Sequence, residues 1–350
     1  MKLAAIICEF NPLHTGHKRL IDYAKTLADK VVCIMSGNFT QRGLPACADK
    51  YSRAKHAILL GADLVVELPT VFATASAENF AYGGIAIANK LGADCLVFGS
   101  ECGNIDELNN CIETINNCDT NMRIRQEVQK GVSYPKAVAL ATGLELLSQP
   151  NNTLAIEYLR ALQNTHSTIK PFTLKREDNY NENEPQQYAS SKALRNVKEL
   201  RDKYSFDYVT QDIDDDIVEK FCQLATSILA VATKEELEQT EGVTEGLHNR
   251  IFNADKTQGY EHMLDDIKTK RYTRLRLQRV ILNQILGITK DLVVNYKANT
   301  PTTKVLAVKA SGVALLKNIE NEIDEITLRA DRLYATLSGK TAPTKLVKIN

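Results

Sequence analysis

The sequence predicts an α/β protein, in which a doubly wound parallel sheet with its covering helices precedes a mostly helical, basic region. In the first hundred residues, short apolar runs alternate with segments of helical spacing. The phrase LGAD occurs twice, each time directly before an apolar run. Past about residue 200 this rhythm stops. We therefore predict two domains, at residues 1–200 and residues 201–350.

The predicted strands are short apolar runs that are rich in Val and Ile and bounded by turn residues. Such runs are typical of parallel strands, because helices cover both faces of a parallel sheet. Right-handed crossovers join such strands, so the runs are expected to share one sheet. They lie at Leu3–Ile7, Val31–Met35, Leu64–Leu68 and Cys95–Phe98, with a fifth candidate at Ile169–Leu174.

The segments between these strands have the spacing of helices. In both LGAD phrases a glycine follows a segment that ends in Leu, and glycine at that position commonly ends a helix. The acidic cluster Asp212–Asp216 favours a helix start. Near the C-terminus we predict a strand at Lys304–Val308 and a helix at Ala314–Leu328. The other predicted helices are Lys18–Ala28, Tyr51–Leu60, Ala75–Leu91 and Leu154–Leu162.

The composition excludes several classes of protein. The chain has 350 residues, 44% hydrophobic and 25% charged, which excludes a collagen-like, mucin-like or wholly disordered chain. No apolar run approaches the roughly 18–20 residues that span a bilayer. The 43 basic and 43 acidic residues balance, but residues 267–350 hold 16 Lys and Arg against 6 Asp and Glu. This basic region is compatible with a polyanionic partner, which the neutral net charge alone would not suggest.

The eight cysteines form no CxxC pair, and several lie in the apolar runs. They are typical of reduced core residues, so we expect a cytoplasmic protein. The N-terminal segment MKLAAIICEFNP has no small-residue cleavage site. A buried strand therefore explains it better than a signal peptide.

The strongest chemical signal is CEFNPLHTGHKRLI, Cys8–Ile21. A strand ends at Phe10, a turn follows, and two histidines lead into a helix. The N–H groups of a helix N-terminus favour phosphate, and Gly16 would let a nucleotide approach the backbone. We predict that His14 and His17 are catalytic, because both can donate to one α-phosphate as pyrophosphate leaves. The alternatives are incidental histidines in a loop or half of a metal site.

FNPLHTGHKRLI resembles the HxGH signature of the nucleotidyltransferase superfamily, which includes adenylyltransferases and the catalytic domains of class I tRNA synthetases. The resemblance implies a HUP or Rossmann-like catalytic domain with a second phosphate motif, ISSxxxR. YASSKALRN, Tyr188–Asn196, stands in that place. Ser190 and Ser191 would hold phosphate oxygens, and Arg195 would reach the β- and γ-phosphates. Taken alone, SSxxxR is an ordinary helix cap.

Further segments resemble the bacterial tRNA(Met) cytidine acetate ligases over nearly the whole chain. They are SGNFTQRG (36–43), DLVVELPTVFATASAENFA (63–81), FGSE (98–101), PNNTLAIEYLRAL (150–162) and LKRE (174–177). The resemblance implies an enzyme that uses ATP and Mg²⁺ to activate acetate as acetyl-adenylate. It would then acetylate N4 of the wobble cytidine of elongator tRNA(Met), forming N4-acetylcytidine.

The same resemblance implies the residues that contact ATP. One asparagine of a neighbouring pair is among them, and Asn151 is preferred to Asn152. With the second motif included, the set is Ile7, Cys8, Glu9, Phe10, Asn11, Pro12, Leu13, His14, Thr15, Gly16, His17, Lys18, Arg19, Leu20, Gly99, Asn151, Asn152, Arg176, Ser190, Ser191 and Arg195.

Residue chemistry supports some of these positions. Gly99 follows a buried strand and could lie against adenine or ribose, or be a plain strand-to-loop glycine. Arg176 could bind a phosphate or be a solvated charge at a strand end. Asn38, Gln41 and Arg42 follow the second strand and should lie near the carboxyl edge of the sheet, where ligands bind.

Three other titratable residues have weaker signals. Glu67 and Glu78 flank the LPT turn and could orient a substrate, although a solvated or structural role is preferred. His56 lies in a helical run and is expected on the surface or in the core.

The candidate RNA-facing segment is KTKRYTRLRLQRVIL, Lys268–Leu282. Basic residues line a predicted helix start, while Leu275, Val280 and Ile281 can pack inward. Each neutralised phosphate would add roughly one unit to the salt slope of log affinity. The alternative is a solvated basic helix face. The predicted tRNA-binding residues are Lys268, Lys270, Arg271, Arg274, Arg276 and Arg279.

Two other functions fit part of this pattern. A small-molecule adenylyltransferase that makes a coenzyme precursor would share both phosphate motifs, but it would leave the basic helical domain unexplained. A non-catalytic RNA-binding protein would not need intact His14, His17 and Arg195. The sequence therefore favours an AMP-forming tRNA ligase without a covalent nucleophile.

Overall fold

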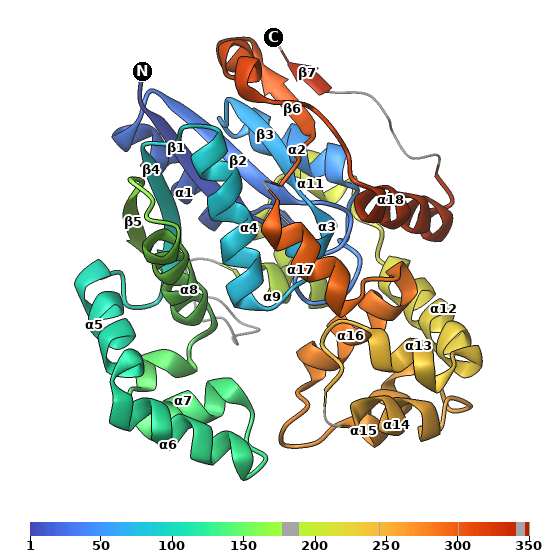
Figure 1. Ribbon diagram of the computed structural model, residues 1–350. Coiled ribbons are helices and arrows are strands. Elements are labelled where there is room, and N and C mark those ends of the chain that lie inside the picture. Colours follow the sequence, from blue (N-terminus) through green and yellow to red (C-terminus); the bar gives the residue numbers. More distant parts are fainter. Residues whose placement is uncertain (177–188, 245, 300, 341–346, 350) are drawn as a thin grey trace.

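A computed structural model describes residues 1–176, 189–244, 246–299, 301–340 and 347–349. Within these residues seven strands form one sheet in the order β5-β4-β1-β2-β3-β6-β7 (Figure 1). β1 to β5 run parallel, β6 is antiparallel to β3, and β7 is parallel to β6. The predicted doubly wound parallel sheet is confirmed. The strands are β1 (Leu3–Cys8), β2 (Lys30–Ser36), β3 (Leu64–Leu68), β4 (Cys95–Ser100), β5 (Lys170–Lys175), β6 (Val305–Lys309) and β7 (Val347–Ile349).

Helices cover both faces of the sheet, which explains why strands β1 to β4 are predominantly apolar and buried. Successive β1 side chains such as Ala5 and Ile6 enter opposite cores. Helices α4 and α8 close one core, and helices α1 and α2 close the other. The helices of this part are α1 (Thr15–Leu27), α2 (Lys50–Leu59), α3 (Thr70–Ala73), α4 (Ala77–Lys90) and α8 (Pro150–Asn164).

Each LGAD phrase ends a helix and also supports the start of a neighbouring strand. Gly61 has φ +116° and Gly92 has φ +69°, so both adopt the backbone conformation that favours glycine. The aspartates that follow are strand caps. Asp63 Oδ2 accepts from an N–H near the start of β2 (3.0 Å), and Asp94 Oδ2 from the first N–H of β1 (2.7 Å).

Two helical groups lie below the sheet in Figure 1, one at lower left and one at lower right. The second group has its own core, into which Phe39 and Val71 of the α/β part also pack. The first group is α5 (Ile105–Asn116), α6 (Cys118–Gln129), α7 (Tyr134–Thr142) and the 3₁₀ turn η1 (Glu145–Ser148). The segment after β5 begins with α9 (Ser191–Asn196), α10 (Glu199–Tyr204) and α11 (Asp207–Thr210). The second group follows and consists of α12 (Ile217–Val231), α13 (Lys234–Gln239), α14 (Leu247–Asn253), α15 (Tyr260–Ile267), α16 (Arg274–Leu286) and α17 (Lys290–Ala298).

After α17 the chain returns to the sheet. β6 pairs with β3, the 3₁₀ segment η2 (Ala310–Asn318) follows, and α18 (Glu325–Ser338) packs against α3 and α12. The single helix predicted at Ala314–Leu328 is wrong, because residues 319–324 separate η2 from α18. The division at residue 200 stays a prediction, but two strands of the sheet come from its second segment.

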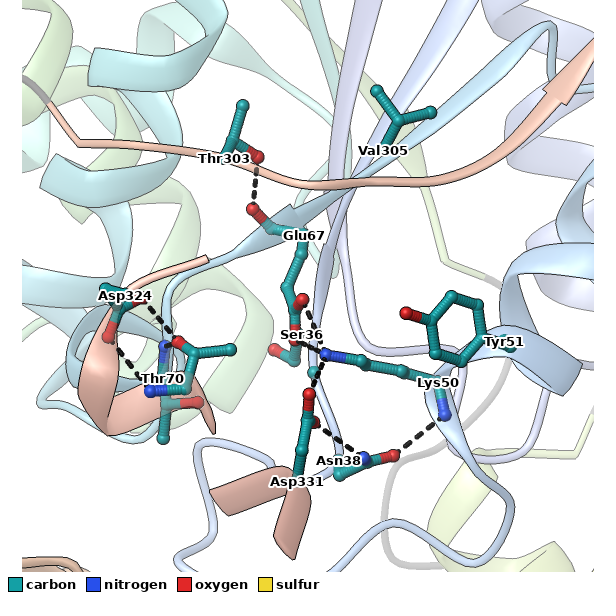
Figure 2. Close-up of polar contacts among 12 residues, drawn as sticks. Ser36, Asn38, Lys50, Tyr51, Glu67, Thr70, Thr303, Val305, Asp324 and Asp331 are labelled. Carbon is teal, nitrogen blue, oxygen red and sulfur yellow. Dashed lines mark hydrogen bonds and ion pairs between the residues drawn. The ribbon is translucent and has the colours of Figure 1, made fainter. Parts of the chain in front are cut away.

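A buried ion network ties α18 to the sheet (Figure 2). Lys50 Nζ on α2 lies 2.7 Å from Glu67 Oε2 on β3 and 2.6 Å from Asp331 Oδ2 on α18. Asn38 Nδ2 donates to Asp331 Oδ1 (2.9 Å), and Asn38 Oδ1 accepts from Lys50 N (2.8 Å). Lys50 and Glu67 are each 1% exposed. One ammonium therefore serves two carboxylates in a region without water access.

The cysteines and the N-terminal segment agree with their predicted roles in the core. All eight cysteines are free, and five of them are buried. The N-terminal apolar run is β1, a fully buried strand in the interior of the sheet. In the described ranges, no helix combines the length and the apolar character that crossing a membrane requires.

Candidate active site

A cavity of about 320 Å³ opens at the carboxyl ends of β1, β4 and β5, beside the N-terminus of α1. Ligands bind at this edge in open α/β sheets. Leu13 is buried in the core and Lys18 pairs with Asp22, so neither faces the cavity. Pro12, Thr15 and Asn152 also lie outside the lining. The predicted ATP-binding residues that line it are Ile7, Cys8, Glu9, Phe10, Asn11, His14, Gly16, His17, Arg19, Leu20, Gly99, Asn151, Arg176, Ser190, Ser191 and Arg195.

His14 and His17 lie at the start of α1, where their rings stack with centroids 3.8 Å apart. His14 is the N-cap, since its Nδ1 accepts from Gly16 N (3.1 Å). An accepting Nδ1 leaves the proton of a neutral imidazole on Nε2, so His14 can donate through Nε2. His17 Nδ1 is buried and has no hydrogen-bond partner among the described residues. The two rings lie together on one side of the turn, as their spacing predicts.

Both histidines are neutral at ordinary pH. Burial, the neighbouring His17 imidazole and the charges of Arg176 and Arg195 lower the pKa of His14 well below its usual value. Burial and Arg176 lower the pKa of His17 to about 3. The rings therefore offer N–H dipoles and not fixed charges.

Gly16 has a steric role that the motif alone does not show. A Cβ at this position would lie 2.9 Å from His14 Cε1. This is closer than van der Waals contact allows, so a larger residue would displace the imidazole from its capping position. The HxGH spacing thus includes a glycine that makes room for the first histidine.

The loop between β1 and α1 is held by two distant segments. Asn11 Oδ1 accepts from Cys47 N (2.8 Å), and the Asn11 carbonyl accepts from Arg195. Ser191 Oγ donates to the Pro12 carbonyl (3.1 Å) across 179 positions of sequence. The two predicted phosphate motifs therefore contact each other directly.

The second motif forms the start of α9. Ser190 is the N-cap, and its Oγ accepts from Ala193 N (3.2 Å). Ser191 and Arg195 line the cavity from this short helix. Burial lowers the pKa of Arg195, as expected for a guanidinium largely removed from water. Tyr188, the first residue of the predicted motif, lies outside the described residues.

The structure distinguishes the two asparagines that sequence reasoning leaves open. Asn152 is fully buried, and its Oδ1 accepts from the backbone N–H groups of Glu101 (2.9 Å) and Cys102 (3.1 Å). Asn151 lines the cavity, and its Nδ2 donates to Glu101 Oε1 (2.7 Å). Asn151 is placed to meet a ligand, whereas Asn152 supports the loop after β4.

Other predicted residues divide between the cavity and the core. Gly99 and Arg176 adjoin each other, since a Cβ at Gly99 would lie 3.4 Å from Arg176 Cγ. Gln41 and Arg42 line the cavity, and Glu9 Oε1 accepts from Gln41 N (2.7 Å). Asn38 does not line it, because its side chain belongs to the buried ion network.

The weaker titratable candidates lie elsewhere. Glu67 is part of the ion network, so its role is structural. Glu78 lies in the first turn of α4 and is not among the lining residues. His56 is buried, with Nε2 2.8 Å from Asp212 Oδ2. Sequence reasoning favours a core or surface role for each, and none reaches the cavity.

The basic segment Lys268–Leu282 differs from its predicted form. Thr273 is the N-cap of α16, so the basic residues up to position 271 precede the helix. Leu275, predicted to pack inward, is 42% exposed and lines the cavity. Val280 and Ile281 are buried, as predicted.

Several of its arginines already have partners within the protein. Arg274 pairs with Glu261. Arg276 Nη2 donates to Gly242 O (3.0 Å) and Thr244 Oγ1 (2.7 Å), and Arg271 Nη2 donates to Val128 O (3.0 Å). Lys268 and Lys270 are exposed. The sequence predicts Arg279 as one of a row of RNA-facing residues. In the structure it lines the cavity.

The cavity wall is strongly positive. Among its described lining residues Glu9 is the one acidic side chain, against seven basic ones. Such a wall favours a polyphosphate ligand. The basic residues are Arg19, Arg42, Lys175, Arg176, Lys192, Arg195 and Arg279.

Comparison with known proteins identifies the family of this chain. Residues 1–337 match the family model described as HIGH Nucleotidyl Transferase. The chain is 35% identical over 353 residues to a Clostridium perfringens protein, covering 91% of this chain and 87% of that protein. It is 37% identical over 355 residues to a Caldicellulosiruptor bescii protein, covering 93% and 87%. Both relatives are named tRNA(Met) cytidine acetate ligase.

The fold also matches a solved structure over its full length. A crystal structure of Thermotoga maritima TmcAL bound with alpha-thio ATP superposes with a TM-score of 0.82 at 24% identity, with all of both chains covered. The apo form of the same protein gives a TM-score of 0.83 at 23% identity. At this identity the match establishes a common fold.

Proposed function

Since the chain belongs to the HIGH nucleotidyltransferases, and among them to the tRNA(Met) cytidine acetate ligases, we propose that it acetylates a tRNA cytidine with acetate and ATP. One observation carries the proposal. Two stacked, neutral histidines stand at a helix N-terminus in a cavity with seven basic side chains and one acidic one. The cations can hold a triphosphate, while the histidines remain available as donors to the oxygens of the α-phosphate that reacts.

In the first step, an acetate oxygen attacks the α-phosphorus of ATP, and the bond to pyrophosphate breaks. Negative charge builds on the α-phosphate oxygens in the transition state. Donors that are already oriented toward those oxygens stabilise this charge without reorganising. We assign this role to His14 and His17, with Ser191 and Arg195 at the departing β- and γ-phosphates.

In the second step, N4 of the wobble cytidine attacks the acetyl carbonyl, and AMP leaves as the amine loses a proton. No covalent enzyme intermediate is needed, since acetyl-adenylate is already an activated acyl donor. The reacting base must reach the cavity, so we infer that it is splayed out of the anticodon loop of elongator tRNA(Met).

Mg²⁺ would accompany the ATP in this scheme. No group of three or more His, Cys, Asp or Glu side chains in the described part of the chain is arranged to hold a metal. Glu9 is the one carboxylate on the described cavity wall. A magnesium ion retains several waters and prefers phosphate oxygens, so Glu9 would supply at most one protein ligand. When bound, the ion would neutralise charge on the leaving pyrophosphate.

Incubating the protein with ATP and labelled acetate, with and without tRNA, tests the proposal directly. We expect labelled tRNA when tRNA is present and labelled acetyl-AMP when it is absent. A small-molecule adenylyltransferase would transfer AMP to another acceptor and label neither product. A non-catalytic RNA-binding protein would bind tRNA and leave ATP intact.

Replacing Arg195 by alanine should mainly impair the ATP-dependent step. Loss of a charge-assisted contact to phosphate typically costs about 1.5–3 kcal/mol, which corresponds to a tenfold to hundredfold lower rate. Arg195→Lys should recover only part, because a point charge does not reproduce the two-pronged guanidinium. Steady-state formation of acetyl-AMP measures both effects.

Pre-formed acetyl-AMP supplies the control for Arg195. It has no β- or γ-phosphate, so the variant should transfer its acetyl group to tRNA at nearly the wild-type rate. Equal damage with acetyl-AMP would show that Arg195 acts through its hydrogen bond to the Asn11 carbonyl, as a structural residue.

We also propose that tRNA phosphates bind at the start of α16. Lys268 and Lys270 are exposed there, and the same helix reaches the cavity through Leu275. Arg271, Arg274 and Arg276, which contact other parts of the protein, would support this surface and add contacts when tRNA is bound. A phosphate held at the helix start would bring the nearby base toward the reaction cavity.

The double substitution Lys268→Gln, Lys270→Gln should leave acetyl-AMP formation unchanged and weaken tRNA binding. If each lysine neutralises one phosphate, the slope of log Kd against log salt should decrease by up to about two. Lys290→Gln is a control, since Lys290 Nζ donates to the Glu238 carbonyl (2.8 Å) on another helix. An unchanged slope in the double variant would place the RNA elsewhere.

A further inference from the structure

Among the described residues, helices α12 to α17 contribute one charged side chain to the cavity lining. Arg279 lies on α16 and lines the cavity together with Leu275, one turn earlier on the same face of the helix. The phosphate residues come instead from the β1–α1 loop, from α9 and from the end of β5. Arg279 therefore reaches the site from a separate structural unit.

Close backbone packing sets the position of Arg279. Gly43 has φ +73°, and a Cβ there would lie 2.5 Å from Arg279 N and from Gln278 C. The same loop carries Gln41, whose carbonyl accepts from Arg279 Nη1 (3.4 Å). Only glycine permits this approach between α16 and the loop after β2. The backbone at Arg279 is thus held against this loop, and among the described residues its guanidinium contacts the loop through the Gln41 carbonyl.

The charge of Arg279 is not neutralised by the described part of the protein. No carboxylate among the described residues forms an ion pair with it, and the long contact to Gln41 is its one described hydrogen bond. Burial, and next the charge of Arg276, lower the pKa of Arg279 to about 10. The side chain remains a cation at neutral pH, and a partly desolvated cation gains by binding an anion.

Arg279 stands apart from the cations that we assign to phosphate. Arg195 lies beside the loop between β1 and α1, where it donates to the Asn11 carbonyl. Arg279 lies beside the loop after β2, where its Nη1 donates to the Gln41 carbonyl (3.4 Å). A second anion could therefore bind at Arg279 while a triphosphate contacts Arg195 and the two histidines.

We propose that Arg279 binds the carboxylate of the small acid that the enzyme activates, with Leu275 against its short alkyl group. The proposal rests on the function proposed above. A carboxylate that approaches a triphosphate meets like charge, and a cation not engaged by phosphate offsets this repulsion. The planar guanidinium matches a carboxylate in a two-pronged contact. Residues four apart on a helix are neighbours, so Leu275 and Arg279 together suit a small acid with one apolar end.

The test compares Michaelis constants in Arg279→Gln. We expect the KM for acetate to rise about tenfold to a hundredfold, with the KM for ATP within about threefold of wild type. Transfer to tRNA from pre-formed acetyl-AMP, which needs no acetate, should stay near the wild-type rate. Arg279→Lys should recover part of the affinity for acetate. Arg329→Gln is the control for loss of an arginine elsewhere, because Arg329 pairs with Glu325 (2.5 Å) and lies outside the cavity lining.

Each other outcome has a definite meaning. A raised KM for ATP with an unchanged KM for acetate would assign Arg279 to phosphate and overturn the proposal. Normal acetyl-AMP formation with impaired transfer would assign Arg279 to tRNA and would overturn the proposal as well. Wild-type protein that forms no acetyl-AMP would instead refute the proposed function.

Folding is checked in the same preparations. Retained transfer from acetyl-AMP shows that Arg279→Gln is folded. If its unfolding temperature falls, the comparison moves to Arg279→Lys, in which the KM for acetate must still rise. Loss of both reactions at a normal unfolding temperature would overturn the proposal.

Discussion

Alanine in place of His14 or His17 should slow acetyl-AMP formation by about 10²–10³-fold per site, as found when one preorganised oxyanion donor is removed. ATP binding should weaken far less than turnover, because the donors matter most when charge develops on the α-phosphate. Both rings are neutral, so their loss removes N–H dipoles and not charges that hold ground-state ATP. Single-turnover formation of acetyl-AMP at saturating ATP is the measurement.

Two matched variants make this result specific. Gln can place an amide N–H near the position of Nε2, so His14→Gln should recover part of the lost rate. His262→Ala removes an exposed histidine of α15 and should change nothing. The His14 variants also lose the N-cap of α1, at a typical cost of about 1 kcal/mol, so unfolding temperatures are recorded with the rates. Near-normal adenylate formation in both alanine variants would refute the mechanism.

Lys50→Met should produce the largest loss of stability, about 3–5 kcal/mol, because it leaves two buried carboxylates without their cation. Lys50 Nζ contacts both Glu67 and Asp331, and the three side chains come from α2, β3 and α18 (Figure 2). Urea unfolding followed by circular dichroism measures the change. Replacing all three residues by apolar or amide side chains should restore much of the stability, since no buried charge is then left unpaired.

The pH dependence of Glu67→Gln tests the charge balance of this network. Burial raises the pKa of Glu67 from 4.5 to about 7, although Lys50 opposes the change. The folded protein then holds a proton that the unfolded chain releases above about pH 4.5, so the Glu67 contribution to stability weakens as pH rises toward 7. The unfolding free energy of Glu67→Gln minus that of wild type should therefore increase as the pH rises from about 5 to about 7.5. A difference that is constant across this range would contradict the raised pKa.

The parallel sheet could be predicted because the strand signal is local and strong. Each strand of the first hundred residues is a predominantly apolar run. Each LGAD segment marks a helix end, because its glycine has a positive φ. The antiparallel addition of β6 to β3 could not be predicted. Which edge a late strand joins depends on the path of the helices between, and a short apolar run such as Val305–Lys309 carries no signal for it.

Within the site, local chemistry predicted two motifs that the structure brings to one cavity, but it missed the features that depend on burial. HTGH specifies a helix N-cap and two imidazoles on one side of a turn. The arrangement of His14 and His17 could therefore be predicted from their spacing. Asn151 and Asn152 are chemically identical neighbours. Only the packing of α8 beneath β4 turns one into the cavity and the other into the core.

By itself the sequence determined the type of most elements, the positions of the HTGH and SSxxxR motifs and the excess of basic residues near α16, because each depends on neighbours along the chain. The tertiary structure decided what those residues face. It directs Arg279 into the cavity, pairs Arg274 with Glu261 and encloses Lys50 between two carboxylates. An arginine or lysine in solvent and one in a cavity are the same residue in the sequence. They differ in their access to water and in their partners, and both depend on long-range packing.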